Sequence, residues 1–208
     1  GTTIGADITM TAGDIGIFAN ITNPSNTKDA KVEVGETGGQ KVEIDAGVVG
    51  VKSYTVGSGD AIILARDNVT IDPDDIGLDA TSLLGESTVS LGANNVIIVD
   101  DNEVAGDDDL NPGIKAGGGQ TFDNKAADPV VDVTLGTGNT ITIKDSSGDN
   151  DVDHGIGIDA YATTVGAGAS VKIITGADLA ISIQGDQAGG ITARSASGTI
   201  NITTAAGK

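Results

Sequence analysis

The chain has 208 residues, of which 30 are acidic and 11 basic, so its net charge is −19. This balance argues against nucleic acid as a partner, because affinity for phosphate backbones comes from clusters of Lys and Arg. The absence of Cys and the single His leave no basis for disulfides, thiolate zinc sites or histidine-based catalysis. No apolar run reaches the ~18 to 20 residues of a membrane span.

The composition predicts an aliphatic core and many tight turns. Aromatic residues make up 2% of the chain, so the core must be built from Ile, Val, Leu and Ala, which suits thin, repetitive layers. Glycine is abundant, with 32 residues, whereas there are 4 prolines. An apolar fraction of 38% is too high for a disordered chain.

Runs of apolar and polar residues with a period of two predict short strands bordered by Gly, Asn or Asp. In chain order the predicted strands span residues 8–10, 31–34, 41–44, 52–56, 61–65, 87–91, 95–99, 130–135, 139–143, 170–174, 179–183 and 199–203. Residues 76–84 favour one short helical turn at most, because Gly77 interrupts them. Gly117 to Gly119 are not followed by the Lys and Ser or Thr of a phosphate loop, so they are interpreted as a flexible loop.

A local signature recurs along the chain: glycine, a small residue, an alternating strand, then glycine. It is found at residues 5–13, 168–176, 176–185 and 198–207. A looser form, an aliphatic residue followed by Gly and a β-rich run, recurs at 56–57, 91–92, 135–136 and 165–166. Repeats of one kind but of irregular length predict an all-β solenoid, a right-handed parallel β-helix whose coils carry different loops. At about 20 to 25 residues per coil, the chain would form about 8 to 10 coils and a body about 40 to 50 Å long.

The domain prediction is a single elongated all-β unit over residues 1–208, with acidic loop insertions near 100–129 and 145–159. A β-sandwich or jelly roll is the alternative, since about twelve strands would fill two sheets.

Residues 6–13 (ADITMTAG) and 197–207 (SGTINITTAAG) resemble repeats of filamentous-haemagglutinin-type surface proteins, which are large secreted bacterial β-helices. The resemblance is clearest over residues 130–208 and over the first twenty. It implies an extracellular or cell-surface location and a role in adhesion or surface architecture. It provides no catalytic residues.

The first candidate metal site is the run around Asp149, Asp151 and Asp153, with Asp159 after it. Carboxylates at alternate positions can point at one cation, as at the start of calcium loops. The run departs from an EF-hand, because His154 and Ala160 stand where that loop needs Gly and Glu. A looser Ca²⁺ site and a solvated acidic turn both remain open.

A second acidic cluster includes Asp101, Asp107 and Asp109. Side chains of one sign this close repel one another unless solvent or cations separate them. Calcium is the candidate cofactor here as well, with a charged loop as the alternative. Millimolar calcium is therefore expected to stabilise the protein by relieving its negative self-repulsion.

Enzymatic activity is not expected. Paired carboxylates can hydrolyse glycosides, and β-helices include polysaccharide-cleaving enzymes. However, two Phe, two Tyr and two Arg offer little from which to build a sugar-binding cleft.

The two ends of the sequence look alike and unprotected. Residues 4–12 and 199–206 contain no proline and no charge except Asp7, whereas solenoid ends are normally blunted by polar caps. The predicted function is a structural subunit of an extracellular fibre or surface layer that polymerises head to tail, with the strand over 200–204 beside that over 4–10 of the next copy. The predicted assembly residues are Ile4, Ile8, Met10, Ile200, Ile202 and Thr204.

The alternative function is a shaft or binding segment of a large calcium-stabilised adhesin. Expected partners are other copies of the chain, with cell-surface glycans or other surface proteins as further candidates. The chain starts at Gly1 rather than Met, as expected for either a cleaved leader or a fragment of a longer protein.

Overall fold

Eighteen strands and no helix make up the described part of the computed structural model, which comprises residues 7–35, 41–101, 110–118, 129–145, 155–163, 169–184 and 188–205. The strands are β1 (Ile8–Ala12), β2 (Ile15–Ile21), β3 (Ala30–Val34), β4 (Val42–Ala46), β5 (Val49–Thr55), β6 (Ala61–Ala65), β7 (Val69–Pro73), β8 (Ile76–Ser82), β9 (Ser87–Leu91), β10 (Val96–Asp101), β11 (Asn111–Gly118), β12 (Val130–Leu135), β13 (Thr140–Asp145), β14 (Gly155–Ala162), β15 (Ser170–Thr175), β16 (Ala180–Ile183), β17 (Gly189–Ser195) and β18 (Thr199–Thr204).

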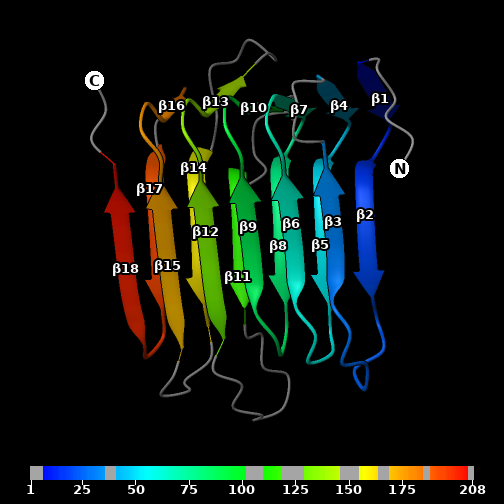
Figure 1. Cartoon of the computed structure of the whole chain (residues 1–208), viewed down its shortest axis with the longest axis vertical. Helices are drawn as coiled ribbons and strands as arrows, with labels where there is room; N and C mark the ends of the chain where they lie inside the picture. Colours follow the sequence, from blue (N-terminus) through cyan, green and yellow to red (C-terminus); the bar gives the residue numbers. More distant parts are fainter. Residues whose placement is uncertain are drawn as a thin grey trace.

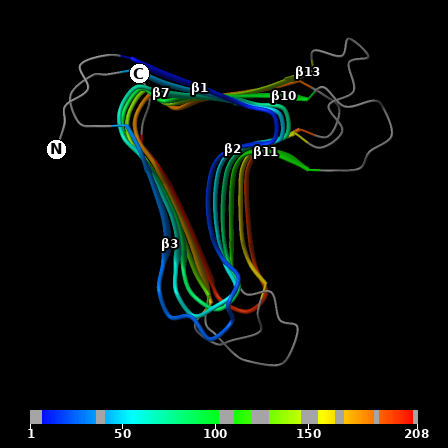
Figure 2. The same ribbon diagram turned by 90° about the vertical axis from the view of Figure 1, so that its right-hand side faces the viewer.

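The strands form three parallel six-stranded sheets. Sheet A has the order β1-β4-β7-β10-β13-β16, sheet B the order β2-β5-β8-β11-β14-β17, and sheet C the order β3-β6-β9-β12-β15-β18. Each coil of the chain therefore adds one strand to each sheet, and six coils stack side by side (Figure 1). Seen along the stack, the three sheets enclose a triangular interior (Figure 2). The solenoid prediction is confirmed, and the architecture is consistent with a right-handed parallel β-helix.

The number and length of the coils differ from the prediction. Pairing on sheet A joins Ile8 to Val42, Thr70 to Val96 and Val96 to Thr140, so coils range from 26 to 44 residues. Six coils at about 4.8 Å per strand span about 24 Å from first to last strand. The expected 8 to 10 coils and 40 to 50 Å were wrong, because the turns between sheets take up more residues than assumed.

The twelve predicted strands all coincide with strands of the structure, and they account for all of sheet C, five strands of sheet A, and β5. The missed strands are β2, β7, β8, β11, β14 and β17. The proposed helical turn at 76–84 is strand β8, and Gly117 and Gly118 end strand β11 rather than lying in a loop. In β8, Gly77, Leu78, Asp79 and Ala80 are all buried, so the polar and apolar alternation that identifies a strand is absent.

The interior is filled by columns of aliphatic side chains, each column taking one residue from the same register position of successive coils. The middle column of sheet A consists of Met10, Ile44, Ile71, Ile97, Ile141 and Ile181. The equivalent column of sheet C consists of Val32, Ile63, Val89, Val133, Ile173 and Ile202. The buried hydrophobic residues are Val, Ile, Leu and Ala, as the composition predicts, and include no aromatic residue among those described.

One corner of the coil repeats with the same backbone geometry. Where the chain passes from sheet C to sheet A, Asn68, Asn94, Gly138 and Asp178 have φ values of 60°, 57°, 69° and 59°. This left-handed conformation favours Gly, Asn and Asp. These residue types therefore mark the same corner in four coils.

Candidate functional site

The predicted assembly residues that the structure describes lie at the two open ends of the stack. Strand β1 is the first strand of sheet A and β18 the last strand of sheet C, and they lie on opposite sides of the molecule in Figure 1. Ile8 and Met10 are 41% and 37% exposed, and Ile200 and Ile202 are both 45% exposed. Thr204 is also exposed, while Ile4 lies outside the described residues.

These exposed side chains are end members of core columns. Met10 continues the column in which Ile44, Ile71 and Ile97 are each 1% exposed. Ile202 continues the column in which Ile173 is fully buried. Each end therefore presents the cross-section of the core, which one further coil would cover.

The sheet topology bears on the predicted pairing of the ends. Strands β1 and β18 belong to different sheets, so direct pairing of these two strands between copies would not continue the solenoid. A coil added after β18 would place its first strand on β16, its second on β17 and its third on β18. The strands that match across such a junction are β16 with β1, β17 with β2, and β18 with β3.

The end strands carry few of the features that normally protect a sheet edge. Strands β1, β2, β16 and β18 contain no Lys, Arg, Asp, Glu or Pro. Natural edge strands are usually blunted by such residues or by bulges, because unpaired N–H and C=O groups pair readily with another strand. Four of the six end strands therefore remain suited to further pairing.

A column of glycines runs through sheet B from one end of the stack to the other. It consists of Gly16, Gly50, Gly77, Gly113, Gly157 and Gly190, aligned by the pairs on either side of them. A side chain on any of the first five would overlap the next coil. At Gly157, for example, a Cβ atom would lie 2.5 Å from the carbonyl oxygen of Gly190 and 2.6 Å from Cγ2 of Ile181.

Gly190 is the exception in this column, because a Cβ atom there would meet nothing within 4 Å. Its backbone is not in the left-handed region that favours glycine. In contrast to the other five positions, no contact within the described structure requires glycine at 190. A coil stacked on β17 would create that requirement, since it would bring a carbonyl oxygen and a side chain to the positions seen at Gly157.

Sequence reasoning missed the glycine column, although the signal was present. Five of the six glycines are followed by an aliphatic residue and preceded by an aliphatic residue or a proline, as in Ile15-Gly16-Ile17 and Ile156-Gly157-Ile158. Most of the signatures noted in the sequence fall on sheets A and C, whereas the one at 56–57 follows β5 of sheet B and the one at 165–166 lies outside the described residues. Of these, Leu91-Gly92 and Leu135-Gly136 do mark equivalent positions in successive coils.

The predicted metal ligands fall mostly outside the described residues, namely Asp107, Asp109, Asp149, Asp151 and Asp153. Asp101 ends strand β10, and Asp159 lies within β14. Asp159 is 1% exposed and pairs with Arg194 rather than with other carboxylates. Within the described ranges, no three His, Asp or Glu side chains are arranged to hold a metal ion. The calcium prediction remains a prediction.

A smaller acidic group lies on the outside of sheet A around Asp72, Asp74 and Asp100. Burial, together with the charges of Asp100 and Asp45, raises the pKa of Asp72 and of Asp74. The Lys144 ammonium lies 2.6 Å from an oxygen of Asp100, and this hydrogen bond raises the pKa of Lys144. Lys144 therefore holds together carboxylates that would otherwise repel one another.

In comparisons with known proteins, no family model matches the chain, and no curated protein or solved structure matches it. The described residues also contain no helix with the length and apolar character of a membrane span.

Proposed function

We propose that this protein is a structural, non-catalytic subunit of an extracellular fibre or surface layer, and that it polymerises by stacking the last coil of one copy on the first coil of the next. The observation that carries the proposal is the glycine column of sheet B. It extends to Gly190, where no contact within the described structure requires glycine. Stacking would place Gly190 against Gly16 and Met10 of the following copy, in the relation that Gly157 has to Gly190 and Ile181.

The two ends also match in their core columns. Met10 would follow Ile181 on sheet A, while Ala30 and Val32 would follow Ile200 and Ile202 on sheet C. Covering the exposed parts of Ile8, Met10, Ile200 and Ile202 contributes about 1 kcal/mol per side chain. Hydrogen bonding between three pairs of strand edges would add to this. Because the two surfaces differ, the contact does not close on itself and generates a fibre.

Electrostatic repulsion opposes this association. Each copy carries a net charge of −19, and copies stacked about 29 Å apart, six coils at about 4.8 Å each, would repel one another. Salt screens this repulsion, and divalent cations bound by the acidic segments would reduce it further. Assembly is therefore expected to require salt or calcium.

The same open ends favour a second function, the shaft of a large calcium-stabilised adhesin. In that case flanking coils of one longer polypeptide would cover the ends. The two functions make different predictions for the 208-residue chain in isolation, since only the fibre subunit should form long, regular polymers from separate copies.

Sedimentation velocity over a concentration series, with and without millimolar calcium, tests the proposal. The wild-type chain should form polymers above a threshold concentration. Gly190→Ala should remain monomeric without any loss of melting temperature, because the added methyl group meets nothing in the monomer. Gly189→Ala is the matched control, since its methyl group would have only ordinary contacts, the nearest being Oγ1 of Thr192 at 3.4 Å.

Polymers of Gly190→Ala with wild-type length would contradict the stacking. A wild-type chain that stays monomeric at high concentration with calcium present would contradict the fibre function and favour the shaft.

A further inference from the structure

The outer face of sheet B gathers most of the aromatic residues of the chain. Phe18, Tyr54 and Tyr161 are three of four aromatic residues. All three alternate with residues that face the interior, such as Ile17 and Ala19, so they point outward. Phe18 is 47% exposed. Because the core uses no aromatic residue among those described, their concentration on one outer face calls for a role other than packing.

Charged residues of alternating sign follow one another along this face. The column that begins at Phe18 continues through Lys52, Asp79, Lys115 and Asp159. Lys52 pairs with Asp79 at 3.1 Å. Lys115 lies between two carboxylates that are 3% and 1% exposed, yet it forms no ion pair among the described residues.

Asp159 is already neutralised from the other side. Nη2 of Arg194 donates to both carboxylate oxygens of Asp159, at 2.6 and 2.8 Å. The two pairs, Lys52 with Asp79 and Arg194 with Asp159, cancel in charge. Over the described residues of this face, the Lys115 ammonium therefore leaves a local charge of +1, on a chain whose total is −19.

Tyr161 lies flat on the sheet in a slot made by a glycine. A Cβ atom at position 117 would lie 2.6 Å from Cε2 of the Tyr161 ring, so the ring occupies the space above Gly117. The Arg194 guanidinium is 5.6 Å from the ring centre. Burial, and next the Asp79 carboxylate, raise the pKa of Tyr161, so the phenol is neutral at pH 7 and adds no negative charge.

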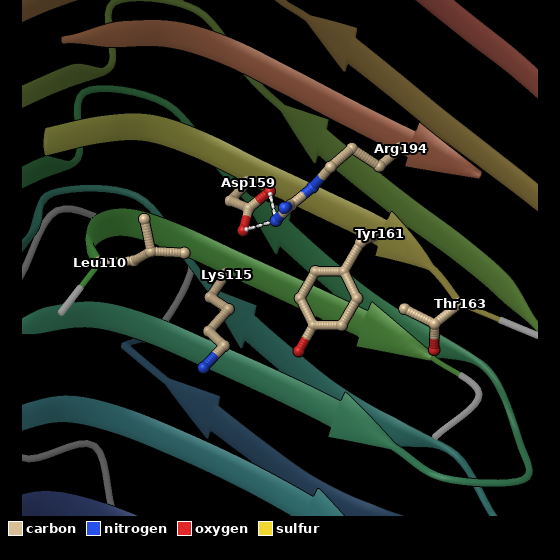
Figure 3. A pocket seen from close by; sticks show the side chains of 6 residues that line it. All are labelled: Leu110, Lys115, Asp159, Tyr161, Thr163 and Arg194. Carbon is tan, nitrogen blue, oxygen red and sulfur yellow. Dashed lines mark hydrogen bonds and ion pairs between the residues drawn. The ribbon is translucent and has the colours of Figure 1, made fainter. Parts of the chain in front are cut away.

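These groups surround a pocket of about 320 Å³. Figure 3 shows the residues that line it: Leu110, Lys115, Asp159, Tyr161, Thr163 and Arg194. Its volume lies at the lower end of the range of ligand sites, about 300 to 1,000 Å³. The pocket therefore suits one small ring rather than a long chain. It combines an apolar side chain, an aromatic ring, oxygen atoms and an ammonium group that has no ion pair with any other described residue.

We propose that this pocket binds a single carboxylate-bearing sugar residue, such as a uronic acid. The Lys115 ammonium would pair with the carboxylate. The apolar face of the sugar would lie along Tyr161 and Leu110, and its hydroxyl groups would meet Asp159 and Thr163. A sugar hydroxyl can donate and accept hydrogen bonds, so it fits lining groups of either kind.

The charges of the pocket argue against two other ligand classes. A divalent cation would be repelled by Lys115 and Arg194. A polyanion or a dianionic phosphate would find one ammonium without an ion pair in the described part of the face, and a chain with a charge of −19 around it. A small monoanion matches the charge of that one ammonium. This proposal does not require assembly, because the pocket lies on the flank of the stack and all its lining residues except Arg194, which belongs to the end strand β17, lie on or beside the inner strands β11 and β14.

Ligand-observed NMR with D-glucuronate, D-glucose and acetate tests the proposal, since it works equally for monomers and polymers. D-Glucuronate should bind the wild-type chain at least tenfold more tightly than either D-glucose, which lacks the carboxylate, or acetate, which lacks the ring. Lys115→Gln should weaken D-glucuronate binding at least tenfold, while Lys115→Arg should preserve it. Lys172→Gln, on the outer face of sheet C, removes the same charge elsewhere and should have no effect.

Several results would overturn the proposal. Equal binding of acetate would mean that no ring is recognised, and equal binding of D-glucose would mean that the charge plays no part. Equal losses in Lys115→Gln and Lys172→Gln would indicate non-specific attraction. Absence of D-glucuronate binding to the wild-type chain would overturn it without any variant.

Discussion

Replacing Gly157 by alanine tests whether the glycine column fixes the distance between coils. The backbone of Gly157 is not in the left-handed region, so alanine is allowed there by conformation. Its methyl carbon would nevertheless lie 2.5 Å from the Gly190 oxygen and 2.6 Å from Cγ2 of Ile181. Overpacking of this kind costs about 1 to 3 kcal/mol. The loss of chain entropy in the unfolded state offsets about 0.4 to 1 kcal/mol.

Gly189→Ala again provides the matched control. Position 189 belongs to the column in which Val49, Ile76 and Ile156 carry side chains, and its nearest new contact is 3.4 Å away. This variant should gain the entropic stabilisation of about 0.4 to 1 kcal/mol without the overlap.

Urea denaturation and thermal melting of both variants measure the difference. A gap of about 2 kcal/mol in the free energy of unfolding corresponds to about 4 to 8 °C in melting temperature for a chain of this size. Equal midpoints for Gly157→Ala and Gly189→Ala would refute the reasoning, because they would show that adjacent coils can separate locally without cost.

Two further predictions concern charged and ionisable groups. Lys144→Gln should destabilise the protein by about 1 kcal/mol at pH 7, because it leaves Asp100 beside other carboxylates without their neutralising ammonium. High salt should restore most of the lost stability. Lys172→Gln, which breaks the more exposed ion pair with Asp132, should cost less stability. A larger loss for Lys172→Gln would contradict this. Because the pKa of Tyr161 is raised in the folded state, its contribution to stability is complete below its unfolded pKa of about 10 and is lost as the pH rises through the folded value. Stability should therefore fall less in Tyr161→Phe than in the wild type between pH 9.5 and 11, and parallel curves would show that Tyr161 is not involved.

The sequence was sufficient to predict most of sheets A and C, because their strands alternate buried aliphatic and exposed polar residues. Strand β3 is a clear case, with Ala30, Val32 and Val34 buried and Lys31 and Glu33 outside. Apart from β5, the strands of sheet B could not be found in this way. They carry the glycine column near their start and include charged residues, such as Asp79 and Asp159, that are buried by their neighbours on the outer face.

The number of coils also could not be predicted, because a strand pattern gives no information about which strands share a sheet. Three strands per coil follow from the pairing of Val42 with Val69 across β4 and β7, and this pairing depends on turns of unequal length. In contrast, the apolar and uncharged sequence around them was enough to predict the end residues Ile8, Met10, Ile200 and Ile202.

The pocket of sheet B could not be predicted from the sequence, since Lys115, Tyr161 and Arg194 come from three different coils.

The central claim is that separate copies stack coil on coil, and the axial repeat of the polymer tests it most directly. Electron microscopy or fibre diffraction of assembled protein should give a strand spacing of about 4.8 Å along the fibre axis and a subunit repeat of about 29 Å, which is six coils. A subunit repeat that is not a multiple of the strand spacing, or strands that run parallel to the fibre axis, would contradict the account.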